Sequence, residues 1–191
     1  VLLLQLTADE ELFDQVHSPL DPAKPNSVKW HQTILTLNGA DGVGSISTQL
    51  AKLAALTVIS SASRPESIAW TQQHGADLVV DHHHDLVSEV HALGIKDVDY
   101  ILGLSDPDSH WNEICTLIKP GGHIASITEN RRPIDLKKLT KKRGTFAWEW
   151  MYTKSYYHTA DMISQHDILE TIADLLDRGL LQSTLSQTLR P

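Results

Sequence analysis

TILTLNGADGVGSISTQLAKL, residues 33–53, is the stretch of this sequence that decides the fold. Its first five residues are β-branched or otherwise apolar and predict a short buried strand. Three glycines follow within residues 39–44, and from residue 43 apolar side chains recur at helical spacing as far as residue 55. The stretch therefore predicts a strand that turns sharply, on glycines, into a helix.

A glycine turn in this position has a specific chemical use. Glycines let the backbone turn tightly and approach a ligand closely, and the N–H groups and dipole of the helix start attract an anion. Between a first strand and a first helix, the pattern is typical of a dinucleotide pyrophosphate site. We expect such a site to be lined by Gly39, Asp41, Gly42, Val43 and Gly44. The alternative is an ordinary strand-to-helix turn.

The rest of the chain alternates strands and helices. Further strands are predicted at residues 56–60, 77–81, 98–102, 123–128 and 145–151. Helices are predicted at residues 43–55, 65–74, 85–93, 108–118 and 161–178. Short apolar strands alternating with helices indicate a parallel sheet covered on both faces. The sequence therefore predicts an α/β protein with a doubly wound parallel sheet, the Rossmann fold.

The N-terminal segment differs from this pattern. Residues 7–17 predict a helix capped by Thr7, and residues 18–27 hold three prolines and predict a loop. The chain opens on VLLL and closes on LRP, and we expect both ends to be cuts within a longer protein. We therefore expect residues 1–27 to be an entry helix and linker from another part of that protein, which the family resemblance given below implies is a missing catalytic domain, and residues 28–191 to be an NAD(P)-binding domain.

The end of the second strand indicates which dinucleotide binds. NAD-binding domains place an acid there to hold the ribose hydroxyls, but residues 60–64 read SSASR. The planar guanidinium of arginine suits a phosphate. We therefore expect Ser61, Ser63 and Arg64 to contact the extra phosphate of NADPH. Alternatively, Ser63 caps the helix that follows, and both roles are compatible.

The ends of the fourth and fifth strands should face the nicotinamide, because ligands of this fold bind at the carboxyl ends of the strands. Leu104, Ser105 and Thr128 lie there in the sequence and are the predicted contacts to ribose or nicotinamide. None of them is a committed acid or base, so the catalytic residues stay unknown.

Several separated motifs resemble the medium-chain dehydrogenase/reductase superfamily, and in particular its zinc-type alcohol dehydrogenase-like branch, related to quinone oxidoreductases. They are GADGVGS (39–45), QLAK (49–52), ASRPES (62–67), GAD (75–77), VDYI (98–101), DSHW (108–111) and FAWEWM (146–151). The resemblance implies a GroES-like catalytic domain outside this chain and hydride transfer from NADPH to a quinone, carbonyl or activated alkene. It also implies that this chain alone is inactive. The alternative is a non-catalytic nucleotide-binding or structural module.

Asp41 departs from the resemblance, because the family usually has glycine there. If its carboxylate faces a pyrophosphate, two like charges ~5 Å apart at an effective dielectric of ~20 cost about 3 kcal/mol, or about a hundredfold in affinity. Alternatively, Asp41 turns inward and caps the helix. We expect weaker cofactor binding than in relatives.

Composition excludes other classes of protein. The net charge of -8 argues against nucleic-acid binding, and no apolar run is long enough for a membrane span. One cysteine, Cys115, rules out a disulfide within the chain and a cysteine-rich zinc site, and fits a cytoplasmic location.

Histidines and aromatic residues give two weaker signals. Residues 82–84 are three histidines, but consecutive side chains point in alternate directions, so a solvated loop fits better than a metal site. Alternatively, Asp81 and His82 border the adenine. We expect no metal in this chain, and zinc in the missing domain is left open. Phe146, Trp148 and Trp150 alternate on one face of the sixth predicted strand, and the resemblance implies homodimers formed through it.

Overall fold

The structure is a computed structural model that describes residues 2–15 and 32–185. The strands are β1 (Thr33–Leu37), β2 (Thr57–Ser61), β3 (Leu78–Val80), β4 (Val98–Gly103), β5 (Ile118–Ser126) and β6 (Thr145–Trp148). The helices are α1 (Leu2–Asp9), the π-helical η1 (Glu10–Gln15), α2 (Gly42–Leu53), α3 (Pro65–Gln73), α4 (Leu86–Ala92), α5 (Pro107–Leu117), α6 (Lys137–Thr140), α7 (Thr153–Tyr157) and α8 (Ser164–Asp177). No helix in these ranges is long and apolar enough to cross a membrane.

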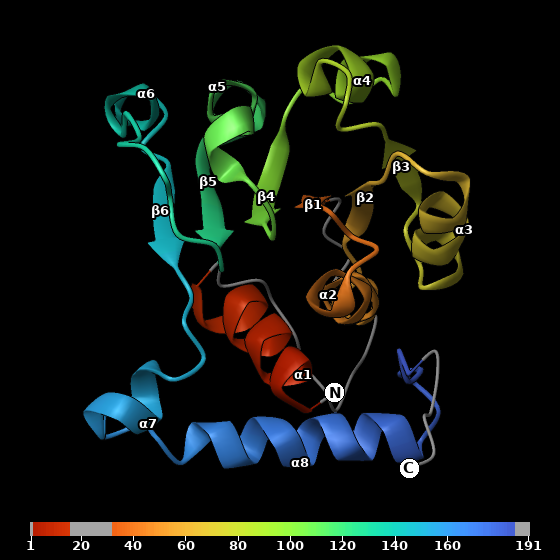
Figure 1. Cartoon of the computed structure of the whole chain (residues 1–191), viewed down its shortest axis with the longest axis vertical. Helices are drawn as coiled ribbons and strands as arrows, with labels where there is room; N and C mark the ends of the chain where they lie inside the picture. The colour runs from red at the N-terminus through yellow and green to blue at the C-terminus, as the bar shows by residue number, and fades with distance from the viewer. Residues whose placement is uncertain (1, 16–31, 186–191) are drawn as a thin grey trace.

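The six strands form one parallel sheet in the order β3-β2-β1-β4-β5-β6. The chain winds outward from β1 to β3 and then returns to build β4, β5 and β6 on the other side. This order confirms the predicted doubly wound Rossmann fold, and the strand order reverses between β1 and β4. The carboxyl ends of β5 and β6 point toward α1 (Figure 1).

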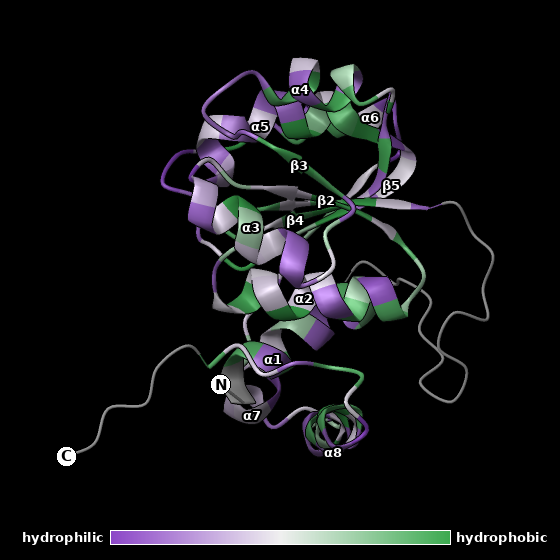
Figure 2. Cartoon of the chain, turned by 90° about the vertical axis from the view of Figure 1, so that its right-hand side faces the viewer, coloured by the Kyte–Doolittle hydropathy of each residue, from purple (hydrophilic) through white to green (hydrophobic). Residues whose placement is uncertain are grey.

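Helices cover both faces of the sheet, which has an apolar core on each side (Figure 2). Ile34 packs in the core that also takes buried side chains from α1, α2 and α8, while its neighbour Leu35 packs in the core under α4, α5 and α6. Successive side chains of a strand point to opposite faces, so a strand buried on both sides is apolar throughout. The structure thus confirms the buried strand that was predicted at residues 33–37.

The N-terminal helix is packed on the domain. Ala8 and Leu12 are fully buried in the core that α2 and α8 share. A Cβ built on Gly42 would lie 2.5 Å from Leu4 Cδ1, so α1 lies directly against the glycine turn. Lys154 of α7 pairs with Glu10 at 3.3 Å and with Asp14 at 2.5 Å, which ties η1 to the C-terminal part of the chain.

Several predicted boundaries were wrong. Thr7 caps no helix, because α1 already begins at Leu2 and Thr7 lies inside it. Strand β5 begins at Ile118 and runs through the Pro-Gly-Gly segment, where a register shift against β4 absorbs Gly121 with its φ of +77°. Strand β6 ends at Trp148, so Trp150 is not part of it. The predicted loop at residues 18–27 lies outside the described residues.

Candidate cofactor site

Glycines allow the turn between β1 and α2 to pack closely on the sheet. A Cβ on Gly44 would lie 2.6 Å from Asn38 O and from Gly39 Cα, and one on Gly39 would lie 1.7 Å from Ser60 Oγ. Ser61 supports the same turn, because its Oγ accepts a hydrogen bond from Asn38 N–H at 2.8 Å. The predicted ligand Ser61 is therefore a buried support of the turn.

The sequence left two orientations of the Asp41 side chain open, and the structure shows the inward one. It is the N-cap residue of α2, and its Oδ1 accepts a hydrogen bond from Gly44 N–H at 2.6 Å. Asn38 Nδ2 donates to the other carboxylate oxygen at 3.2 Å. Burial raises the pKa of Asp41, and the N–H groups of Gly44 and Val43 partly offset that rise. A carboxylate of the chain itself thus occupies the amides that an incoming anion would use.

A cavity of about 340 Å³ opens over this turn. It is lined by Ala40, Asp41, Gly42, Ser45, Trp70 and Thr184. Trp70 reaches it from α3 and donates from Nε1 to Ser45 Oγ at 2.7 Å. Two predicted residues, Asp41 and Gly42, therefore border an open space at the start of α2.

A second cavity, of about 280 Å³, adjoins the first at Ala40 and lies at the carboxyl end of β2. Its lining residues are Asn38, Ala40, Ala62, Ser63, Arg64, Ser67, His82 and His83. Arg64 is the exposed N-cap residue of α3, so Ser63 does not cap that helix. The structure thus brings the predicted Ser63 and Arg64 together with two histidines from the loop after β3.

The histidines of this cavity were assigned to a solvated loop. His82 Nδ1 is buried without a hydrogen-bond partner in the described part of the chain, and burial lowers the pKa of this side chain. The rings of His82 and His83 lie 4.7 Å apart. The sequence suggested His82 near the adenine, but His83 and Ser67 were not singled out, although Ser67 ends the ASRPES motif.

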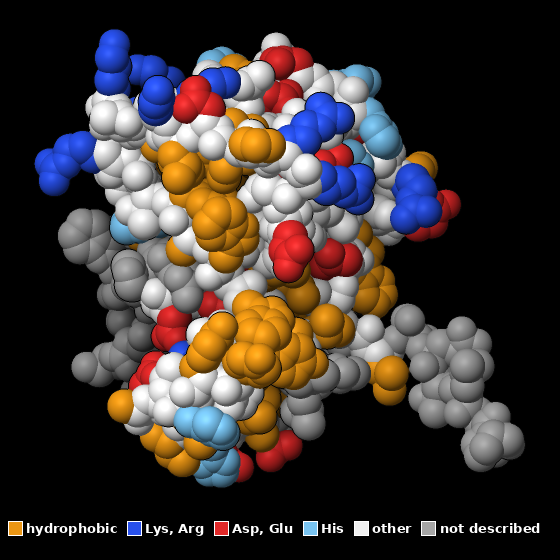
Figure 3. All heavy atoms as spheres, turned by 60° about the vertical axis from the view of Figure 1, so that its left-hand side comes forward, with side chains coloured by type: hydrophobic (Ala, Val, Ile, Leu, Met, Phe, Trp, Pro, Cys, Tyr) orange, Lys and Arg blue, Asp and Glu red, His pale blue; other side chains and the backbone are white. Residues whose placement is uncertain are grey.

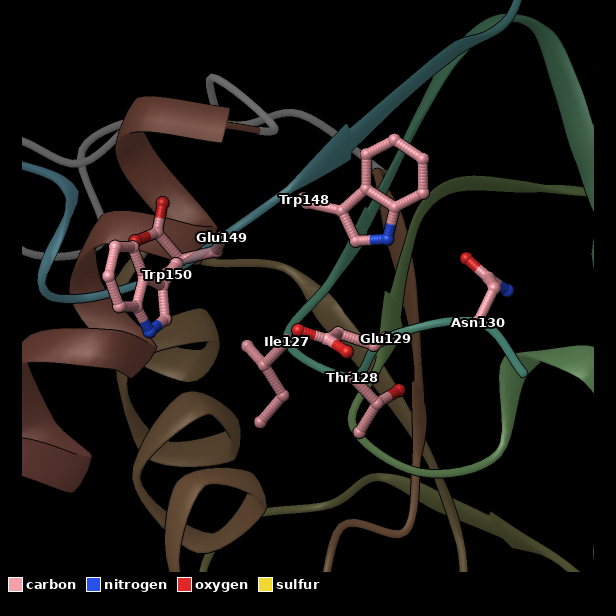
Figure 4. Close-up of a pocket in the computed structure, with 7 residues that line it drawn as sticks. All are labelled: Ile127, Thr128, Glu129, Asn130, Trp148, Glu149 and Trp150. Atoms are coloured by element: carbon pink, nitrogen blue, oxygen red, sulfur yellow. The ribbon is translucent and has the colours of Figure 1, made fainter.

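A third cavity, of about 630 Å³, lies at the carboxyl ends of β5 and β6 (Figure 4). Its lining residues are Ile127, Thr128, Glu129, Asn130, Trp148, Glu149 and Trp150. Thr128 was predicted there, but Leu104 is buried in the core and neither it nor Ser105 lines a cavity described here. Both tryptophans were assigned to an interface, although their place at the end of β6 and just after it pointed equally to this edge of the sheet.

Metal-binding and nucleophilic groups are not assembled here. Among residues 2–15 and 32–185, no group of three or more His, Cys, Asp or Glu side chains could hold a metal ion. Cys115 is buried, and burial raises the pKa of its thiol to about 11, so it is an unreactive core residue. The described residues therefore do not form a binding site for a zinc ion.

Known proteins are similar in sequence to this chain over nearly its whole length. A zinc-type alcohol dehydrogenase-like protein of Staphylococcus aureus strain MSSA476 is 40% identical over 185 residues, covering 97% of this chain and 54% of the relative. A zinc-type alcohol dehydrogenase-like protein of Staphylococcus epidermidis is 37% identical over 187 residues, covering 98% and 54%. The chain thus spans about half the length of the curated relatives it matches.

Solved structures show the same fold. A Rhizobium etli CFN 42 protein assigned as a zinc-dependent alcohol dehydrogenase superposes with a TM-score of 0.89 at 35% identity, over 100% of this chain and 54% of its own. Escherichia coli quinone oxidoreductase, solved with NADPH, gives 0.73 at 19% identity, over 96% and 54%, and shares the fold. The family model described as zinc-binding dehydrogenase matches residues 42–165. This chain belongs to the zinc-binding dehydrogenase family.

Proposed function

We propose that this chain is the cofactor-binding domain of an NADPH-dependent oxidoreductase whose full-length form transfers hydride to a quinone, carbonyl or activated alkene. The observation that carries the proposal is the row of cavities along the carboxyl ends of the strands, where this fold binds dinucleotides. Bound NADPH would supply the hydride, and the chain would bind and orient it. We also propose that residues 1–27 lead in from a separate catalytic domain.

The choice of NADPH over NADH depends on the cavity beside Arg64. Its lining contains an arginine, two serines and two histidines, all of which can donate hydrogen bonds, and no carboxylate. No ion pair engages Arg64 in the part of the chain that the structure describes. A ribose phosphate would find donors here, whereas the acid that usually holds a free ribose hydroxyl is missing from residues 60–64.

Replacing Arg64 with glutamine tests the cofactor assignment. We expect the dissociation constant for NADPH to rise about tenfold, because a hydrogen bond between charged groups is lost, while that for NADH stays unchanged. Calorimetric titration with each dinucleotide measures both values. Arg131→Gln is the matched control, since it removes one exposed arginine outside the three cavities. An equal loss for NADPH and NADH would contradict the assignment.

The second candidate is a non-catalytic nucleotide-binding or structural module. The observation in its favour is Asp41, which fills the amides at the start of α2 with a carboxylate. Tight, NADPH-selective binding by the wild-type chain would count against a purely structural module, and hydride transfer by the full-length protein would count against a non-catalytic one.

We also propose homodimerisation through β6, which lies at one edge of the sheet. Of the three aromatic residues, Phe146 and Trp148 lie on one face of β6 with their rings 4.8 Å apart. Phe146 also packs edge-on against Trp111 in the core at 5.3 Å, and Trp148 is 55% exposed. Trp150 contacts Tyr152 and Tyr156 beyond the strand. The proposal therefore rests on the free edge of β6 and on Trp148.

A lysine on the edge strand tests this pairing. Thr145→Lys should convert a dimer to a monomer in sedimentation velocity, because a charged edge side chain opposes strand addition. Thr145 is exposed, so we expect the fold to tolerate the change. A wild-type chain that sediments as a monomer at all concentrations would refute pairing through β6.

A further inference from the structure

We infer that the cavity at the carboxyl ends of β5 and β6 favours a flat, positively charged ring, so that this chain binds NADP⁺ more tightly than NADPH. The inference rests on the proposed function and on the expectation that the nicotinamide faces the carboxyl ends of the fourth and fifth strands. Oxidised nicotinamide is an aromatic cation, and the reduced ring is neutral. The two cofactors therefore differ in charge at the ring alone, and a charged site can distinguish them.

The lining of this cavity is acidic. Of its seven residues, Glu129 and Glu149 carry carboxylates, and none is lysine, arginine or histidine. Glu149 is only 8% exposed, while Glu129 is exposed on the loop after β5. Figure 4 shows the Glu129 carboxylate turned toward Ile127, across the hollow that the two indoles border. A cation in this space would have the Glu129 carboxylate nearby and no positive side chain in the lining.

Two aromatic side chains add to the same preference. Trp148 and Trp150 line the cavity and are 55% and 49% exposed, so their rings remain open to a ligand. Tryptophan is the best aromatic partner for a cation, because its ring face is electron-rich. Figure 3 brings this side of the molecule forward and shows two groups of hydrophobic side chains with acidic side chains between them.

The nearest basic residues in the sequence do not cancel this charge. Arg131 and Arg132 follow Asn130 but do not line the cavity. Asp108 accepts from the backbone N–H of Arg131 at 2.7 Å, and its pKa is lowered mainly by the hydrogen bond from Asn130 and, least, by the charge of Arg132. The charge of Arg132 thus acts on a carboxylate outside the cavity.

The two ends of the site have opposite character. Arg64, His82 and His83 surround the cavity at the carboxyl end of β2, whereas the cavity after β5 and β6 carries only carboxylates as charged groups. A ligand with a phosphate at one end and a cationic ring at the other matches both ends. Among the nicotinamide cofactors, NADP⁺ has this pattern.

Paired titrations of the 191-residue chain with NADP⁺ and NADPH test the inference. We expect NADP⁺ to bind about fivefold more tightly at neutral pH, which is the size of one cation–aromatic contact plus one exposed ion pair. Glu129→Gln should reduce the preference to about twofold by weakening NADP⁺ binding, because only the contact with the aromatic rings then remains. Glu66→Gln, an exposed glutamate on α3, is the matched control and should leave the preference intact.

The possible results separate this inference from the proposed function. Equal affinities, or tighter binding of NADPH, would overturn the inference and leave the cofactor assignment standing. A preference for NADP⁺ that survives Glu129→Gln would also overturn it, because the carboxylate would then play no part. Binding of neither dinucleotide would overturn both proposals. Thermal melting of each variant shows whether the fold is intact.

Discussion

Replacing Asp41 with asparagine tightens NADPH binding by up to about a hundredfold. In the wild-type chain, the Asp41 carboxylate accepts a hydrogen bond from Gly44 N–H at 2.6 Å. It therefore places a negative charge at the start of α2. A diphosphate ~5 Å away at an effective dielectric of ~20 would be opposed by about 3 kcal/mol, which corresponds to the stated factor. Asparagine removes the charge and keeps an oxygen that can cap the helix. Calorimetric titration with NADPH measures the change.

The capping role and the charge can be separated by two comparisons. Asp41→Gly should tighten binding to a similar extent and lower the stability of the domain by only a few tenths of a kcal/mol. Asp85 is the control, because it caps α4 in the same manner, with Oδ1 accepting from Ser88 N–H at 2.7 Å, but lines none of the three cavities. Asp85→Asn should leave NADPH affinity unchanged. If neither Asp41 variant binds more tightly, the diphosphate does not meet this carboxylate.

The fold could be predicted from the sequence because the central strands are buried on both faces. Residues 33–37 are apolar or β-branched for that reason, and the glycine turn marks where β1 gives way to α2. Strand ends were less predictable. The fifth strand was predicted at residues 123–128, but a local register shift lets β5 begin at Ile118 and run through the Pro-Gly-Gly segment.

The candidate site was predictable only where a motif is local. Ser63 and Arg64 follow β2 directly and were found, whereas His83 joins them from a different loop. Ser61 was assigned as a ligand, but its hydroxyl accepts from the backbone of Asn38, a contact that depends on the turn geometry. The orientation of Asp41 stayed open because both orientations fit the same sequence, and only the packed structure distinguishes them.

The second large expected effect is on the stability of the domain, and it comes from buried carboxyl groups near the glycine turn. Glu11 is fully buried, and neither carboxylate oxygen has a hydrogen-bond partner in the described residues. Burial raises the pKa of Glu11 well above its usual range, and the charges of Glu149 and Asp41 raise it further. Burial also raises the pKa of Asp9 to about 7, with smaller contributions from Asp14 and Glu10.

The sign of the pH dependence follows from these shifts. An acid whose pKa is higher in the folded state holds its proton there, while the unfolded chain releases it as the pH rises. Its stabilising contribution is therefore complete below the unfolded pKa and is lost as the pH rises toward the folded value. For Asp9 this window runs from 3.8 to about 7 and corresponds to about 4 kcal/mol. We expect Asp9 and Glu11 to make the domain less stable at neutral than at mildly acidic pH.

Glu11→Gln tests this expectation, because glutamine has nearly the same shape and no proton to lose. The variant should be more stable than the wild type at neutral pH by up to about 3 kcal/mol, the free energy needed to keep an ordinary glutamic acid protonated there. The gain should shrink toward zero near pH ~4, and urea unfolding at several pH values measures it. Glu66→Gln makes the same change on an exposed helix face and should have little effect at any pH. A loss of stability in Glu11→Gln at neutral pH would mean that the folded protein stabilises the charged carboxylate, and it would reverse the assigned electrostatics around Asp41.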